Sequence, residues 1–111
     1  MPVGSSDRSM PSGSGGGASA IRRDVKIVNK RGLHARAAAR FAKLAEEFDA
    51  EILVTGSGMT VSALSIMGLM MLGAGPGTSI EIAAGSLQNP AGANSAVAAL
   101  CALVEAGFDE E

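Results

Sequence analysis

The sequence predicts an α+β fold, an open-faced sandwich in which three helices cover one face of a four-stranded, mostly antiparallel sheet. Two observations lead to this prediction. Short segments in which apolar and polar residues alternate are interspersed with segments whose apolar residues recur every three or four positions. Turns rich in glycine and proline separate these segments, and the resulting order of elements is βαββαβα.

The first half of this fold is expected to be a strand, a helix and a hairpin. Residues 25–28 alternate in polarity as a half-buried strand does, and residues 35–48 show an amphipathic helical pattern. Residues 52–55 and 59–62 flank a turn at residues 56–58 and should pair with each other. The helix carries its main apolar side chains on one stripe: Phe41, Leu44, Ala45 and Phe48.

The second half is expected to be a helix, a strand and a longer helix. Residues 65–72 form the short helix, with Ser65 as its N-cap and Gly73 at its end. Apolar and polar residues alternate over residues 78–84, which predicts the fourth strand. Residues 90–106 form the last helix, whose apolar face suits packing on the sheet.

The start of the last helix has two candidate positions. Asn89 is a good N-cap, and Pro90 suits the first helical position. Gly92 weakens that first turn, so a start nearer Asn94 stays open.

Residues 1–20 differ from the rest of the chain in composition. They are rich in Gly, Ser and Pro and contain almost no large apolar side chains. Such a segment cannot bury enough surface to offset chain entropy, so we expect a disordered tail. It lacks the apolar stretch of a signal peptide. Residues 21–111 are then one folded domain, which we expect to be a monomer.

Composition excludes several classes of partner. A net charge of −2 gives no overall basic surface for nucleic acid. No apolar run is both long enough and free enough of glycine to cross a membrane. The single cysteine, Cys101, excludes an internal disulfide, and its helical spacing with Val97 and Leu100 indicates a core residue. These features are typical of a cytoplasmic protein that binds neither nucleic acid nor membranes.

The single histidine, His34, is the first candidate for chemistry. It follows Gly32 closely and precedes a run of strong helix formers. A helix N-terminus attracts anions through its free amides and its dipole, and Arg36 adds a fixed cation two residues later. This arrangement predicts a histidine that carries a phosphoryl group. The alternative is an ordinary surface or capping histidine.

A basic stripe begins beside that histidine. Arg36, Arg40 and Lys43 share one face of the predicted helix, and an acidic partner surface would suit them. The alternative is a solvated face without a partner. The sequence contains no phosphate-binding loop, no paired carboxylates near the histidine and no metal-ligand spacing. We therefore expect neither cofactor nor metal, and a protein that does not turn over by itself.

The short helix is apolar almost all round. Leu69 and Leu72 suit the side that faces the sheet, whereas Ile66, Met67 and Met70 would form an exposed docking patch. The alternative is a loosely packed core filled with adaptable methionines. Ser65 has two readings as well, a plain N-cap or a regulatory phosphorylation site whose phosphate the helix N-terminus tolerates.

Two separated motifs resemble one protein family. Gly-Leu-His-Ala-Arg stands at residues 32–36, and Leu-Ser-Ile-Met-Gly-Leu-Met-Met-Leu-Gly stands at residues 64–73. Together with the order of elements and the Gly-Thr before the fourth strand, they resemble HPr, the histidine phosphocarrier of the bacterial phosphoenolpyruvate-dependent phosphotransferase system. The resemblance runs from about Val25 to Val104.

The resemblance implies roles for individual residues. His34 matches the histidine that accepts phosphate through Nδ1 from enzyme I and passes it to a IIA-type protein of a sugar-uptake or regulatory relay. Arg36 matches the arginine that contacts the phosphoryl group. Ser65 matches the serine that a dedicated HPr kinase/phosphorylase modifies with ATP in regulated members. Ile66, Met67 and Met70 match exposed positions that dock partners, and the basic stripe adds Arg40 and Lys43 to the expected docking residues.

The chain also departs from the family. Ala37 stands where the family usually has proline, which loosens the entry to the helix. Residues 86–94 are several positions longer than usual. The alternative function is a small regulatory or ligand-binding α+β domain without phosphotransfer. That function requires convergent polar groups lining a pocket, and the sequence indicates none. A silent adaptor of the same type would lack the histidine.

Overall fold

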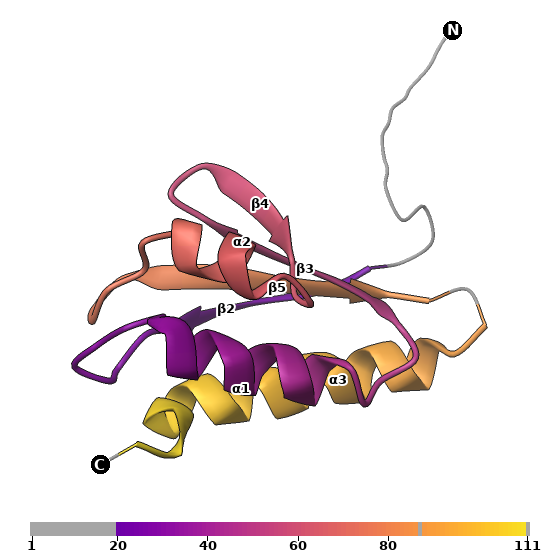
Figure 1. Cartoon of the computed structure of the whole chain (residues 1–111). Helices are drawn as coiled ribbons and strands as arrows, with labels where there is room; N and C mark the ends of the chain where they lie inside the picture. The colour runs from indigo at the N-terminus through magenta and orange to yellow at the C-terminus, as the bar shows by residue number, and fades with distance from the viewer. Residues whose placement is uncertain (1–19, 87, 111) are drawn as a thin grey trace, which may run out of the picture.

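The computed structural model describes residues 20–86 and 88–110 and confirms the predicted α+β sandwich (Figure 1). The sheet has the strand order β2-β5-β3-β4, and every neighbouring pair is antiparallel. Its strands are β2 (Ile21–Lys26), β3 (Glu51–Gly56), β4 (Met59–Ser62) and β5 (Ser79–Gly85). The expected disordered tail, residues 1–20, lies outside the described residues apart from Ala20.

The helices lie on one face of the sheet, as expected (Figure 1). They are α1 (Ala35–Ala45), α2 (Ile66–Met71), α3 (Pro90–Glu105) and the short 3₁₀ turn η2 (Gly107–Asp109). α1 contacts both α2 and α3, and η2 packs on α1 and α3. In the part of the chain that the structure describes, no helix is long and apolar enough to cross a membrane.

The first strand lies earlier than predicted. The prediction of residues 25–28 is wrong, because β2 pairs with β5 from Ile21 to Lys26. The charged residues of this segment obscured the pattern, although they lie on an exposed edge strand where charge is tolerated. Val25 and Ile27 are both buried, as the alternation required.

The first helix is shorter than the predicted residues 35–48. It ends at Ala45. The amide of the C-cap residue Glu46 still bonds four residues back, to Ala42, whereas the amides of Glu47 and Phe48 bond only three residues back. This tightening suits a helix that is followed directly by Glu46 and Glu47, whose charge is unfavourable at the negative end of the dipole. The other elements agree with prediction to within one or two residues at each end.

Side chains cap the two later helices. The Ser65 hydroxyl oxygen accepts from the amide of Gly68 at 2.9 Å, and the side-chain Oδ1 of Asn89 accepts from the amide of Gly92 at 2.9 Å. The last helix therefore begins at Pro90, and a start nearer Asn94 is wrong because the Asn89 cap stabilises the first turn.

Aliphatic side chains and two phenylalanines form the core between the layers. Phe41 enters it from α1, and Phe108 enters it from η2, each with no exposed surface. Cys101 is buried as predicted, and burial raises the pKa of its thiol. The C-terminal turn thus contributes Phe108 to the core.

Gly32 fixes the loop that precedes α1. Its φ is +65°, a left-handed conformation, and an added Cβ would lie 2.3 Å from the carbonyl oxygen of Ala74. The next amide, that of Leu33, donates to the same oxygen at 3.0 Å. Only glycine lets this loop lie directly on the backbone of residues 74 and 75.

We predict that Gly32→Ala destabilises the domain by more than about 2 kcal/mol, because the new methyl group meets backbone as well as requiring a left-handed alanine. Gly58→Ala is the matched control. Gly58 is also left-handed at φ +76°, but its Cβ would meet nothing within 4 Å. Urea denaturation measures both, and equal losses would show that the contact with Ala74 is unimportant.

Candidate functional site

His34 is the N-cap of α1, as the sequence predicted. Its backbone is extended, and its carbonyl oxygen accepts the amide of Ala38 at 2.8 Å. Its imidazole caps no amide among the described residues, and its side chain is 21% exposed. The ring therefore stands at the positive end of a helix dipole without serving the helix itself.

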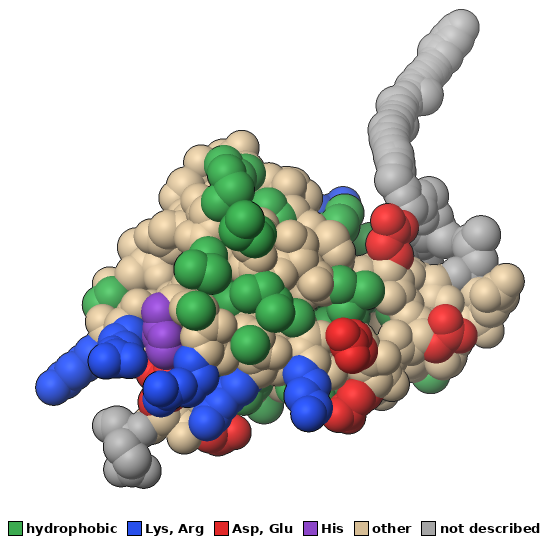
Figure 2. Space-filling view, viewed as in Figure 1, with side chains coloured by type: hydrophobic (Ala, Val, Ile, Leu, Met, Phe, Trp, Pro, Cys, Tyr) green, Lys and Arg blue, Asp and Glu red, His purple; other side chains and the backbone are tan. Residues whose placement is uncertain are grey.

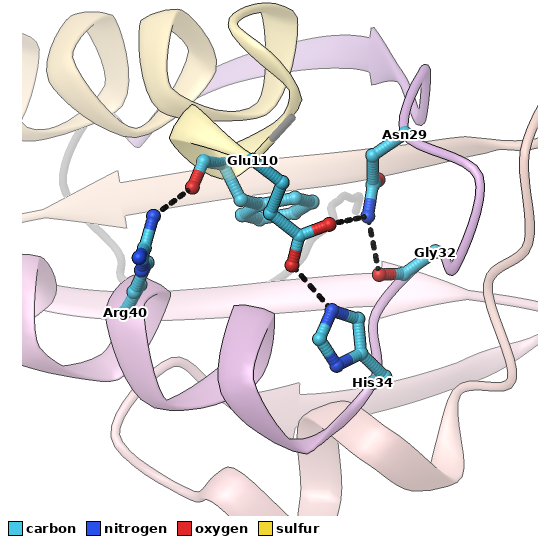
Figure 3. A network of polar contacts seen from close by, with 6 residues as sticks. Asn29, Gly32, His34, Arg40 and Glu110 are labelled. Carbon is cyan, nitrogen blue, oxygen red and sulfur yellow. Dashed lines mark hydrogen bonds and ion pairs between the residues drawn. The ribbon is translucent and has the colours of Figure 1, made fainter.

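The imidazole contacts a carboxylate that comes from the far end of the sequence. Nε2 of His34 is hydrogen-bonded to Oε2 of Glu110, 76 residues away (Figure 3). The other oxygen, Oε1, accepts from the side-chain amide of Asn29 at 3.0 Å. Both carboxylate oxygens are thus engaged. The sequence indicated no paired carboxylates near the histidine, and the fold brings the single carboxylate of Glu110 into contact with the ring.

Asn29 links this carboxylate to the loop that carries His34. Its Nδ2 donates to the carbonyl oxygen of Gly32 at 2.9 Å as well as to Glu110 (Figure 3). Both partners are acceptors, so the amide orientation is settled by its contacts. Asn29 is 8% exposed, and its Oδ1 is buried without a partner among the described residues.

Arg40 holds the turn from which Glu110 projects. Its guanidinium donates to the backbone carbonyl of Phe108, whose own side chain is fully buried (Figure 3). The basic stripe is therefore not uniform. Arg40 is tied to the C-terminal turn, whereas Arg36 and Lys43 are exposed on α1.

The pKa of the Glu110 carboxyl is lowered from its ordinary value. The largest cause is the hydrogen bond from His34, followed by that from Asn29. Partial burial acts in the opposite direction, and the charges of His34 and Arg31 assist the lowering. Glu110 therefore stays ionised to lower pH than a free glutamate does.

A polar pocket opens beside the histidine loop, between the segment that follows β2 and the C-terminal turn. It is lined by Val28, Asn29, Lys30, Arg31, Arg36, Arg40, Glu105, Ala106, Gly107, Asp109 and Glu110. The expectation that no convergent polar groups would form a pocket is wrong. The groups come from three segments distant in sequence, and among them four cationic side chains face three carboxylates.

An apolar surface lies next to the basic one (Figure 2). Met67 is 75% exposed, Ile66 and Met70 are each 42% exposed, and Leu69 and Leu72 are buried against the sheet. The structure thus places the three predicted docking side chains at the surface. Leu64 and Met71 extend the same exposed set. We call Ile66, Met67 and Met70 the apolar patch.

Ser65 lies directly before the apolar patch. Its hydroxyl is occupied as an acceptor by the Gly68 amide, and the residue is partly exposed. A Cβ at Gly68 would lie 2.9 Å from that hydroxyl oxygen, so glycine leaves room for the cap. The predicted N-cap is confirmed.

The sequence singled out His34, Arg36 and Ser65 as candidates but did not point to Glu110 and Asn29, which the structure places in the polar network around His34. Neither missed residue has a spacing that relates it to the histidine. A weak signal was available in Asn29, a polar residue that continues the buried alternation of Val25 and Ile27. Its burial implies a partner, which the sequence could not name.

Comparison with known proteins identifies the family. The family described as "PTS HPr component phosphorylation site" matches residues 21–106. The chain belongs to the HPr family. Members of this family are phosphocarriers of the phosphotransferase system, as the motif around His34 predicted.

Relatives carry two different names. The phosphocarrier protein NPr of Shewanella violacea is 48% identical over 90 residues, which is 81% of this chain and 94% of the relative. The phosphocarrier protein HPr of Neisseria meningitidis is 47% identical over 62 residues, 56% of this chain and 70% of the relative. The crystal structure of HPr from Bacillus anthracis superposes with a TM-score of 0.70 at 38% identity, covering 78% of this chain and 98% of that one.

We predict a specific acid dependence of stability from the lowered Glu110 pKa. Above its ordinary value of 4.5 the ionised carboxylate stabilises the fold fully. As the pH falls below 4.5 the unfolded chain takes up the proton first, so this stabilisation is progressively lost. The stability of the parent should therefore fall more steeply below pH 4.5 than that of Glu110→Ala.

Urea titrations between about pH 3 and 7 measure this difference. Glu47→Ala, which removes an exposed carboxylate, is the control and should keep the slope of the parent. Parallel curves for the parent and Glu110→Ala would contradict the prediction.

Proposed function

We propose that this protein accepts a phosphoryl group on His34 from phosphorylated enzyme I and passes it to a IIA-type protein. The observation that carries the proposal is the position of the imidazole. It stands at the N-terminus of α1, partly exposed, two residues before Arg36, in a chain of the HPr family. By itself the protein is a carrier and not an enzyme.

The chemistry requires few groups. A lone pair of the neutral imidazole forms a bond to phosphorus while the bond from phosphorus to the donor breaks. The first amides of α1 lack partners within the helix, and with the dipole they favour the incoming dianion. Arg36 is the side chain that we assign to contact the phosphoryl oxygens, through charge-assisted hydrogen bonds. The protein thus contributes mainly by positioning the imidazole and the phosphoryl group, and no further catalytic group is required.

We assign the protein to the NPr type of carrier. Relatives named NPr align over 90 residues in Shewanella violacea and 92 residues in Klebsiella oxytoca, whereas the Neisseria relative named HPr aligns over 62. This likeness favours a regulatory relay over sugar uptake. Enzyme I and the IIA-type protein are then the expected partners, in the cytoplasm, and the carrier itself is expected to act as a monomer.

The docking surface that we propose combines the apolar patch with the cations of α1. Figure 2 places the exposed apolar surface and the basic side chains next to each other, with the histidine between them. Arg40 and Lys43 provide the positive edge, and Met67 is the most exposed member of the patch. An acidic groove with an apolar floor on enzyme I would match this surface.

The proposed function makes three predictions, of which the first concerns His34. His34→Ala should abolish labelling that depends on phosphoenolpyruvate and enzyme I, because the nucleophile is gone. Intact-mass analysis measures the added phosphoryl group, and an unchanged circular dichroism spectrum shows that the fold is kept. Acid-labile label on the variant would contradict the assignment. Phosphate bound without a covalent mass increase on the parent would favour the alternative, a ligand-binding domain that uses the polar pocket.

The second prediction concerns Met67. Met67→Glu should raise the Kd for enzyme I about tenfold or more, since a charge replaces an apolar docking side chain. Leu53→Glu is the matched control, an exposed apolar side chain of β3 whose neighbours Ile52 and Val54 face the core. Titration calorimetry measures both variants, and equal affinities would exclude the apolar patch from docking.

The third prediction concerns Ser65, which we propose as a regulatory phosphorylation site of an HPr kinase/phosphorylase. Ser65→Asp keeps a competent cap, so stability should hold, while the added charge at the edge of the patch slows phosphoryl uptake by His34. Ser65→Ala should lose about 1 kcal/mol of stability and keep transfer. Uptake by Ser65→Asp at the parent rate would leave Ser65 as an N-cap only.

A further inference from the structure

We propose that Glu110 is a positioning residue for phosphoryl transfer, which selects Nδ1 of His34 as the nucleophilic nitrogen and orients the ring. This inference rests on the proposed function of His34 as the phosphoryl acceptor. It goes further by assigning a role to the C-terminal turn, which lies outside both sequence motifs. Asn29 and Arg40 act through Glu110, because they locate its carboxylate.

The argument begins with the tautomer of His34. An ionised carboxylate can only accept hydrogen bonds, so the ring nitrogen that faces Oε2 of Glu110 must carry the proton. A neutral imidazole has one N–H, and its other nitrogen then has the free lone pair. With Nε2 facing Glu110, that other nitrogen is Nδ1. The Glu110 carboxylate, by accepting from one ring nitrogen, thus decides that the other nitrogen can attack phosphorus.

The carboxylate is itself held in place. Its Oε1 accepts from Asn29, and the same Asn29 nitrogen donates to the carbonyl oxygen of Gly32 in the loop that carries the histidine. Asn29 therefore fixes the Glu110 carboxylate relative to the same loop that carries the imidazole. Asn29 is nine-tenths buried, so water competes little for these contacts.

The turn that delivers Glu110 is conformationally unusual. Phe108 and Asp109 have φ values of +58° and +59°, which residues other than glycine rarely adopt. The burial of the Phe108 ring and the bond from Arg40 to its carbonyl oxygen retain this turn. Residues in such conformations persist when their surroundings over-determine them, commonly at functional sites. Here the consequence is that Glu110 faces His34.

The same contact serves both directions of transfer. When the Nδ1 lone pair bonds to phosphorus, positive charge develops on the ring, and the Glu110 carboxylate across Nε2–H offsets it. When phosphorus leaves, the electron pair of the N–P bond returns to Nδ1. The Nε2 proton stays in place throughout, so neither step needs a proton shuttle. The other charged groups that line the adjacent pocket are Lys30, Arg31, Arg36, Arg40, Glu105 and Asp109.

The experiment has one arm that needs no phosphoryl donor. With a single histidine in the chain, ¹⁵N-histidine labelling gives one set of ring signals. At a pH where the ring is neutral, the parent should show an Nε2-bound proton that exchanges slowly with water, with Nδ1 unprotonated. Glu110→Ala should lose this proton signal, and Glu110→Gln, whose amide oxygen still accepts, should keep it. Glu47→Ala, an exposed carboxylate at the end of α1, is the matched control.

The second arm measures the rate of a single phosphoryl uptake from phosphorylated enzyme I. We expect Glu110→Ala to be about ten- to a hundredfold slower than the parent, Glu110→Gln intermediate and Glu47→Ala unchanged. Uptake by Glu110→Ala at the parent rate, or an Nε2 proton signal in that variant, overturns the inference. If the parent takes up no phosphoryl group, the proposed function fails instead, and the ring signals alone decide whether Glu110 sets the tautomer.

Discussion

The buried ring of Phe108 fixes the C-terminal turn against α1 and α3, and the geometry around His34 depends on it. Burial of a phenylalanine stabilises a packed domain by about 1.5–3 kcal/mol, which is of the same order as the cost of the left-handed Phe108 and Asp109, about 1–3 kcal/mol each. Glu110 follows two residues later and has little freedom once that ring is seated. A core contact therefore sets the orientation of a partly exposed imidazole.

Three kinds of surface meet at the histidine. The head of α1 favours an anion, the side chains of Arg36 and Lys43 extend that preference along the helix, and the apolar patch lies beside them. A transferred phosphoryl group needs the first, and a protein partner needs the other two. Under the proposed function, this arrangement lets a small domain combine a phosphoryl acceptor with a surface for partner proteins.

Much of this structure could be predicted from local sequence. The period of the apolar residues gave the order of elements, and Ser65 and Asn89 were recognised as caps because their partners are three residues away. The start of β2 could not be predicted, since Arg22 and Arg23 hide an edge strand that pairing with β5 alone defines. His34 and Arg36 could be proposed as site residues because the helix start and its cation are adjacent in sequence.

Glu110 and Asn29 could not be found in this way. Their contacts with the histidine loop arise only when η2 packs on α1 and α3, and no spacing in the sequence encodes that approach. The pocket beside His34 was missed for the same reason, because its cations and carboxylates come from three separate segments. Long-range polar contacts of this kind are the part of a site that cannot be predicted from a single sequence.

The distance of 76 residues between His34 and Glu110 also bears on when the site forms. A contact between groups so far apart closes a long loop, and closing it is slow compared with forming a helix turn. On the ribosome, the loop and α1 emerge long before the turn that completes them. A nascent or C-terminally clipped chain would display the histidine with its tautomer unselected. For the proposed carrier, competence for transfer is thus coupled to completion of the fold.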